Sequence, residues 1–138
     1  MLLRRQQKRE GVTVVECAVI FPIVFLLLAG CIIAGIGVFR YQEISALARE
    51  GARYASVRGA YYEFHTGKKA TTPQEVYEQA ILPKAVVLDQ KRLTYSVTWS
   101  PDNRLGGTVT VTVNYFWIPE GFLGGIQLSS TSTMLVTY

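Results

Sequence analysis

The sequence is poor in the side chains that most catalytic and metal sites use. It holds two cysteines and one histidine, His65, among 138 residues. No cluster of cysteine, histidine or acidic residues surrounds His65, so we expect no metal site and no cofactor. The signatures G-x-S-x-G, H-E-x-x-H and C-x-x-C do not occur in the chain. The composition therefore argues against an enzyme and gives no sign of a small-molecule substrate.

An intrachain disulfide is also excluded. Cys17 and Cys31 both lie in a long apolar run. If that run is helical, the 14 residues between them at a rise of 1.5 Å put them about 21 Å apart. A disulfide needs Cα atoms within about 7 Å, so the two cysteines cannot pair in one chain. The rest of the chain has no cysteine and needs no disulfide to fold.

Positive charge is concentrated in a short N-terminal leader. The first eleven residues carry four basic groups against one acid, which is +3 of the formal net charge of +4. The remaining 10 basic and 9 acidic residues nearly cancel. Nucleic-acid binders instead gather lysine and arginine on one folded face, so no nucleic-acid partner is expected. The basic leader residues are Arg4, Arg5, Lys8 and Arg9.

An uncharged run of 23 residues extends from Cys17 to Phe39. About 20 apolar residues suffice to span a bilayer, so the run predicts a transmembrane helix. A cleaved secretory signal would have a shorter core of roughly 7–15 residues followed by a small-residue cleavage site. The basic leader predicts a cytoplasmic N-terminus and an extracytoplasmic C-terminal part, because positive residues favour the inside. We expect a single pass through the membrane.

Three residues of the run bear on how the helix packs. Pro22 is tolerated in a membrane helix because neighbouring helices can satisfy the carbonyl group that it frees. Gly30 and Ala34 form a small-xxx-small pair that permits close helix packing. Glycine and alanine are also simply common in membrane helices, and the sequence leaves both interpretations open.

Glu16 is the unusual residue, because an acid inside a membrane helix costs roughly 2.5–3.5 kcal/mol on insertion scales. It either lies at the level of the lipid headgroups or has a cationic partner. If the chain is cut after Gly11, Val12 carries a free ammonium group and Glu16 becomes the fifth residue. The two are then spaced i,i+4, and the same geometry lets Glu16 reach the amino terminus of a neighbouring subunit.

A basic leader ending in glycine, with glutamate as the fifth residue of a long apolar helix, resembles the precursors of type IV pilins and pseudopilins. A wider stretch resembles the TadE-like family of minor pseudopilins from tight-adherence (Flp-type) pilus systems. The matching residues are Gly11, Val15, Glu16, Ala18, Pro22, the run Leu26–Gly30, and "AREGARYA" from Ala48 to Ala55, which contains Arg49, Glu50, Gly51, Arg53 and Tyr54.

The resemblance implies a structural and assembly protein, held in the inner membrane and cut by a prepilin peptidase after Gly11. Its implied partners are that peptidase and the other pilins or pseudopilins of the same system. The alternative is an uncleaved, single-pass anchored module whose C-terminal part binds a partner outside the membrane. This alternative needs no role for Glu16.

The sequence predicts an α+β fold of three parts: a leader (1–11), a long spine helix (12–59) and a C-terminal head (60–138). Apolar and small residues in the second half of the helix recur every three or four positions, which suits packing on a sheet. They are Ile44, Leu47, Ala48, Gly51 and Ala55. Glu50 and Arg53 are spaced i,i+3 and can pair on the polar side.

The head is predicted to contain a short helix and a three-stranded antiparallel sheet. Residues 60–72 read as a polar loop, and residues 73–82 as a helix capped by Thr72 and Glu75 and stopped by Pro83. Alternation of apolar residues with threonine and serine predicts strands near 93–100, 108–118 and 128–138. Trp99 and Trp117 are expected in the core, and the helices are expected to cover the sheet.

Overall fold

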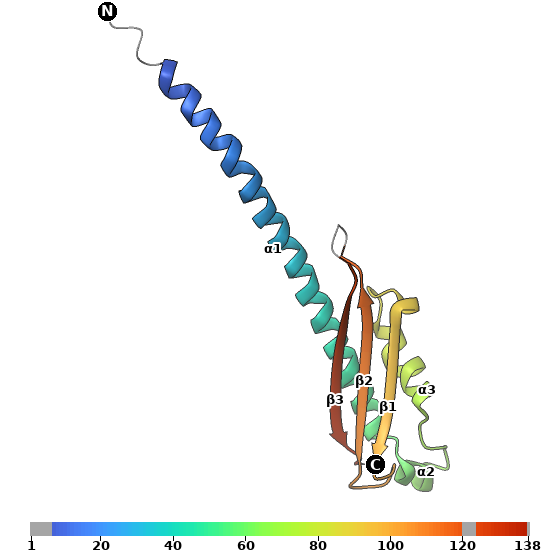
Figure 1. Cartoon of the computed structure of the whole chain (residues 1–138). Coiled ribbons are helices and arrows are strands. Elements are labelled where there is room, and N and C mark those ends of the chain that lie inside the picture. The colour runs from blue at the N-terminus through green and yellow to red at the C-terminus, as the bar shows by residue number, and fades with distance from the viewer. Residues whose placement is uncertain (1–6, 120–123, 138) are drawn as a thin grey trace, which may run out of the picture. The chain divides into compact units, whose positions relative to one another are not determined.

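The computed structural model describes residues 7–119 and 124–137, with side chains from Gly11 onward except that of Val12 (Figure 1). The predicted class is confirmed: a long apolar N-terminal helix, short helices and a three-stranded antiparallel sheet. The helices are α1 (Gln7–Ser56), α2 (Ala60–Thr66) and α3 (Pro73–Val76); the π turn η1 is Tyr77–Ile81, and the 3₁₀ turns are η2 (Leu82–Lys84) and η3 (Gln90–Arg92). The strands are β1 (Leu93–Ser100), β2 (Thr108–Trp117) and β3 (Ile126–Leu135).

The chain divides into two compact units, Met1–Ile36 and Gly37–Tyr138, and we call the second the globular unit. The described part of the first unit is the apolar portion of α1, which continues through Pro22 without a break. The helix begins at Gln7, five residues before the expected start at Val12. The residues Gln7 to Glu10 are good helix formers, which explains the early start. Residues 1–6 of the predicted leader lie outside the described part of the chain.

The apolar portion of α1 is not covered by protein. The exposed fraction is 69% for Phe21, 71% for Phe25 and 70% for Leu26. An 18-residue window of α1 reaches a mean hydropathy of 2.9 and none of it is buried within the chain. The core helix of a soluble protein would instead be mostly buried. By length and composition the helix can cross a membrane, and this fits a membrane anchor.

The sheet has the order β1-β2-β3, with both pairs antiparallel. Inward residues alternate with outward threonines and serines as predicted, and Val109, Val111 and Val113 are fully buried. On the outer face, threonine hydroxyls pair across β2 and β3, with Oγ1–Oγ1 distances of 2.9 Å for Thr110–Thr133 and for Thr112–Thr131. The alternation therefore sets which face of the sheet packs on the helices.

The second half of α1 covers the inner face of the sheet. Every residue of the predicted stripe is buried, as is Ala52, which the prediction omitted. Small residues let the helix backbone approach the sheet closely. A Cβ atom added to Gly51 would lie 3.1 Å from Val111 Cγ1, and one added to Gly37 would lie 2.8 Å from the ring of Trp117. Trp99 and Trp117 pack, partly buried, against the core, as expected.

The predicted short helix is present but shorter and less regular. Its capping box is confirmed: Thr72 Oγ1 accepts from the Glu75 N–H at 3.2 Å, and Glu75 Oε2 accepts from the Thr72 N–H at 3.2 Å. The α-helical part ends at Val76 and widens into the π turn η1. Pro83 lies in the 3₁₀ turn η2 and does not stop the helix abruptly. The wider turn carries Ile81 fully into the core and stacks Tyr77 on Tyr95 at 4.3 Å.

The prediction that residues 60–72 form a loop is wrong for its first half, which is α2. Gly59 is the N-cap of α2, so it begins a second helix; α1 itself ends earlier, at Ser56. Gly67 ends α2 in the left-handed conformation, with φ of 69° and its N–H donating to Glu63 O at 3.0 Å. Glycine adopts this conformation without the steric cost of a Cβ atom. The loop is therefore confined to the residues between Gly67 and Thr72.

Candidate functional site

The predicted processing site lies within an unbroken helix. Gly11 is exposed, and a Cβ atom added there would meet nothing within 4 Å. The side chain of Val12 is outside the described ones. Glu16 is exposed and forms no ion pair with any described side chain. In a helix, positions 12 and 16 are one turn apart, so the backbone provides the spacing that the predicted charge pair requires.

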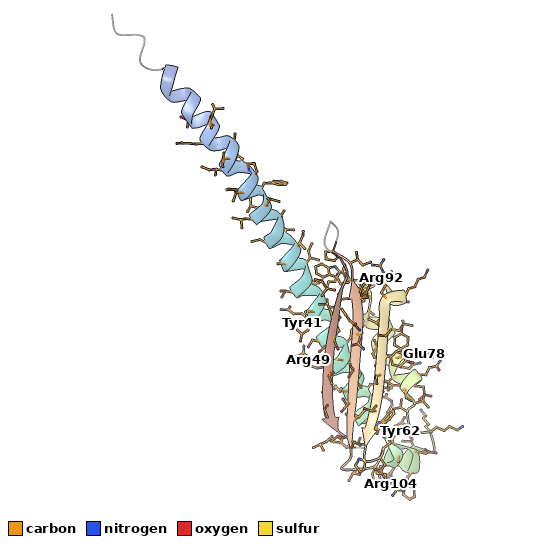
Figure 2. The ribbon with its side chains drawn as sticks, in the orientation of Figure 1. Tyr41, Arg49, Tyr62, Glu78, Arg92 and Arg104 are labelled. Carbon is orange, nitrogen blue, oxygen red and sulfur yellow. The ribbon has the colours of Figure 1, made fainter. Side chains whose placement is uncertain are left out.

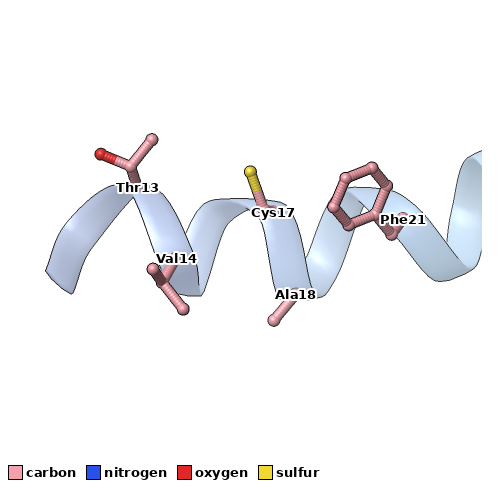
Figure 3. Close-up of a pocket in the computed structure, with 5 residues that line it drawn as sticks. All are labelled: Thr13, Val14, Cys17, Ala18 and Phe21. Atoms are coloured by element: carbon pink, nitrogen blue, oxygen red, sulfur yellow. The ribbon is translucent and has the colours of Figure 1, made fainter. Parts of the chain in front are cut away.

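A shallow apolar cavity of about 370 Å³ lies against α1 close to Glu16 in the sequence. In Figure 3, Thr13, Cys17 and Phe21 form one row along the helix, and Val14 and Ala18 form the row beside it. The small side chains of Cys17 and Ala18 leave room beside the ring of Phe21. Such a depression can accept a side chain of a second helix, which is how membrane helices associate closely.

The other predicted packing residues also lie on the uncovered surface of α1. Gly30 and Ala34 are exposed, and Cβ atoms added to Gly30 or Gly35 would meet nothing within 4 Å. Cys17 and Cys31 are both exposed and free, as their separation along the helix requires. The small residues thus form an open helix surface, and no described part of the chain packs on it.

The segment "AREGARYA" mostly holds α1 to the sheet. Gly51 is buried against Val111 and Ile81, whereas Arg49 and Arg53 are exposed. Tyr54 carries the guanidinium of Arg58 over its ring at 3.9 Å. The segment's small residues therefore serve packing, and its charged residues face away from the core.

Glu50 does not form the expected ion pair with Arg53. Its Oε1 lies 2.7 Å from Lys84 Nζ, on η2. The hydrogen bond from Lys84 holds the pKa of the Glu50 carboxyl below its usual 4.5, although partial burial opposes this shift. Lys84 and, more weakly, Arg53 add Coulombic attraction in the same direction. The contact joins α1 to the turn that follows the π helix.

The family similarity covers the predicted processing site, the apolar helix and most of the packed part of α1. Residues 11–53 match the TadE-like protein family. This is a TadE-like segment. The predicted resemblance is confirmed over these residues, which run from the predicted cleavage site through the apolar helix into the packed part of α1. No curated protein and no solved structure matches the chain significantly.

Sequence reasoning missed two contacts that shape the globular unit. Lys84 as the partner of Glu50 and Arg58 as the partner of Tyr54 were both absent from the expected contacts. Arg58 follows Tyr54 by four positions, a spacing that could have indicated the pair, although α1 ends at Ser56 and Arg58 lies just beyond it. Nothing in the spacing of Glu50 and Lys84 signals their contact, because it depends on how the π turn folds back. Among the described residues no group of three His, Cys, Asp or Glu side chains is placed to hold a metal ion.

Proposed function

We propose that the protein is a minor pseudopilin-like structural and assembly component of a tight-adherence pilus. The observation that carries the proposal is the TadE-like match over residues 11–53, which begins at the residue predicted to precede the cut. The uncovered apolar helix in the same segment fits a pilus-associated membrane protein. The proposed role is structural, in keeping with a pilus-associated family.

In this proposal, the leader (1–11) is cytoplasmic and is removed by a prepilin peptidase. The spine (12–59) is held in the inner membrane and the head (60–138) is extracytoplasmic. Gly11 suits the peptidase because it places no side chain in the cleft. Since α1 is helical on both sides of the Gly11–Val12 bond, the peptidase must unwind this turn before it cuts.

Glu16 then has a specific partner, the ammonium group of Val12 on an adjacent subunit. Each charge alone would be costly in the bilayer, and bringing them together offsets part of the cost of removing both from water. A slipped alignment of two helices would leave both charges unpaired. The pair therefore favours one register over the others. The cavity beside Cys17 and the pair Gly30–Ala34 supply the close contact surfaces, because apolar burial gives no net drive between helices in lipid.

The continuous helix through Gly11 also favours a second candidate, an uncleaved membrane anchor. In that case, the C-terminal head would bind a partner outside the membrane and Glu16 would lie among the lipid headgroups. The two candidates differ in whether residues 1–11 remain on the protein in its own membrane.

The assembly role is tested by replacing Glu16 with glutamine, which keeps the size of the side chain and removes its charge. We expect normal amounts in the membrane and a loss of assembly with partner pilins of about tenfold or more, the loss that follows from removing one member of a desolvated ion pair. The control is Lys91→Gln, which removes an exposed charge that forms no ion pair with any described side chain. Normal pilus output from Glu16→Gln would contradict the charge pair.

A further inference from the structure

A polar cavity of about 360 Å³ lies in the globular unit, between the end of α1, the loop after α2 and the start of α3. Its lining includes Arg58, Lys68, Lys69, Thr71 and Tyr62, together with Glu75. Tyr62, labelled in Figure 2, lies on α2. The volume lies in the range of small-ligand pockets. The TadE-like match ends at residue 53, so the whole cavity lies outside it.

Unpaired positive charge gathers in this cavity. Arg58, Lys68 and Lys69 form no ion pair with any described carboxylate. Glu75 is the acid in the lining, so three cations and one carboxylate give a formal charge of +2. The ion pairs among the described residues of the globular unit use other cations. They are Arg40–Glu43, Lys84–Glu50, Arg92–Asp89 and Arg104–Asp102.

The guanidinium of Arg58 is held in place before any ligand arrives. Its Cζ atom lies 3.9 Å from the centre of the Tyr54 ring, within cation–π distance, so this contact restricts where the guanidinium can lie. The guanidinium N–H groups form a rigid fork of donors. A planar donor set of this kind matches the oxygens of a phosphate group.

The loop that presents the two lysines is also fixed. Glu63 Oε2 accepts from the Ala70 N–H at 3.2 Å, and Arg58 O accepts from the Thr71 N–H at 3.0 Å. The left-handed Gly67 sets the direction in which this loop leaves α2. The lysine side chains remain free to adjust, but their backbone is anchored to α2 and to the residue that supplies the guanidinium.

Thr71 adds an unsatisfied donor at the same place. Thr71 is 5% exposed and its Oγ1 is buried without a hydrogen-bond partner among the described residues. A buried hydroxyl without a partner is costly, so such groups are rare in proteins. Thr71 also lines the cavity, so an anion bound there could accept a hydrogen bond from this hydroxyl.

We propose that this cavity binds a phosphate dianion. The formal charge of +2 matches a dianion, whereas a carboxylate would leave one cation uncompensated. Because Glu75 Oε2 accepts a hydrogen bond from the Thr72 N–H, the Glu75 carboxylate repels a bound anion less than a carboxylate without a hydrogen bond would. The proposed phosphate site does not depend on the proposed assembly role, so an experiment can disprove one proposal without disproving the other.

The phosphate is expected on a water-soluble molecule and not on a lipid of the same membrane. The apolar run ends at Phe39 and Tyr54 lies 15 residues further along the same helix. At 1.5 Å per residue this is about 22 Å of helix beyond the run, too far for a lipid headgroup to reach. Phosphorylated sugars and free phosphate share the required chemistry.

The test uses the full chain in neutral detergent micelles at about pH 8, where phosphate is mostly a dianion. Amide NMR shifts of residues 67–72 are followed during titration with inorganic phosphate, and with acetate at the same ionic strength. We expect saturable shifts with phosphate, weaker ones with acetate, and binding about tenfold weaker or more in Arg58→Gln. Thr71→Val should also weaken binding. Lys91→Gln, which removes an unpaired charge elsewhere, should leave it unchanged.

The double variant Lys68→Gln/Lys69→Gln keeps the test valid if Arg58→Gln unfolds, since both lysine side chains are exposed. Glucose 6-phosphate and nanodiscs containing phosphatidic acid distinguish the sources of phosphate. Saturable binding of the sugar phosphate supports the proposal. Shifts with the nanodiscs alone would contradict a water-soluble phosphate ligand and indicate a lipid headgroup. No saturable shift, equal affinity for acetate, or an equal effect of Arg58→Gln and Lys91→Gln would overturn the site itself.

Discussion

Gly51 gives the sharpest test of how α1 packs on the sheet, through the substitution Gly51→Leu. The added Cβ atom would already lie 3.1 Å from Val111 Cγ1 and 3.3 Å from Ile81 Cδ1. Val111 and Ile81 are fully buried, so neither can move away without disturbing the core. Overpacking of this kind costs typically about 1–3 kcal/mol and occasionally more. Leucine regains roughly 1 kcal/mol of helix propensity over glycine, and the clash of a whole side chain outweighs this gain.

We therefore expect Gly51→Leu to destabilise the globular unit by on the order of 1 kcal/mol net, which lowers its melting temperature by roughly 5 °C. Tryptophan fluorescence of the full chain in detergent measures this unit, because the two tryptophans, Trp99 and Trp117, both pack against its core. Gly51→Ala should change stability little, because tight contact and propensity gain nearly cancel. The control is Gly30→Leu, where the added side chain meets no protein. An unchanged melting temperature for Gly51→Leu would refute the close packing of α1 on the sheet.

Three further predictions concern processing and stability. Gly11→Leu should block the cut and leave a full-length chain in its host membrane by immunoblot, and a mature-sized product would reject Gly11 as the cut site. Thr72→Ala should remove the cap of α3 and cost about 1 kcal/mol in thermal unfolding, with no loss expected if the cap is irrelevant. The lowered pKa of Glu50 stabilises the folded state above its unfolded pKa of 4.5, and this contribution is lost as the pH falls through the lower, folded value. Because the pair is exposed, the difference between wild type and Glu50→Gln should be under about 1 kcal/mol at neutral pH and vanish in acid, and a pH-independent difference would contradict it.

The packed face of α1 and the sheet could be predicted because both depend on local periodicity. Ile44, Leu47 and Ala48 follow the helical repeat, and all three are buried. Alternation in β1 and β2 likewise fixes which residues face inward, because a one-residue slip would reverse every side chain. These patterns are strong because each side of the element meets a different environment.

The parts that escaped prediction depend on contacts between residues far apart in the sequence. Residues 60–66 have polar and aromatic side chains without clear periodicity, and the first N–H of α2, that of Ala60, donates to Asn103 O at 2.8 Å. The π turn η1 ends at Ile81, whose side chain is fully buried in the core. The phosphate cavity joins Arg58 to Lys68 and Lys69 through a fold-back that no motif signals. Helix and strand patterns say little about such junctions.

The residues of the candidate assembly site, in contrast, could be predicted from the sequence. Gly11, Glu16 and Pro22 could be identified from the sequence pattern and its resemblance to the TadE-like family, and the TadE-like match includes all three. Their proposed roles require a second subunit and a peptidase, so they depend on chemistry outside the single chain. The structure contributes the helix that spaces Val12 and Glu16 by one turn, and the uncovered surface on which a partner helix can pack.

The central claim is that Glu16 pairs with an ammonium group created at Val12. The most direct measurement is the intact mass and N-terminal sequence of the protein purified from the membranes of its own host. The account predicts a chain that begins at Val12 and lacks the first eleven residues. A chain that still begins at Met1 would leave Glu16 without this partner, contradict the pseudopilin-like role, and support the uncleaved anchor.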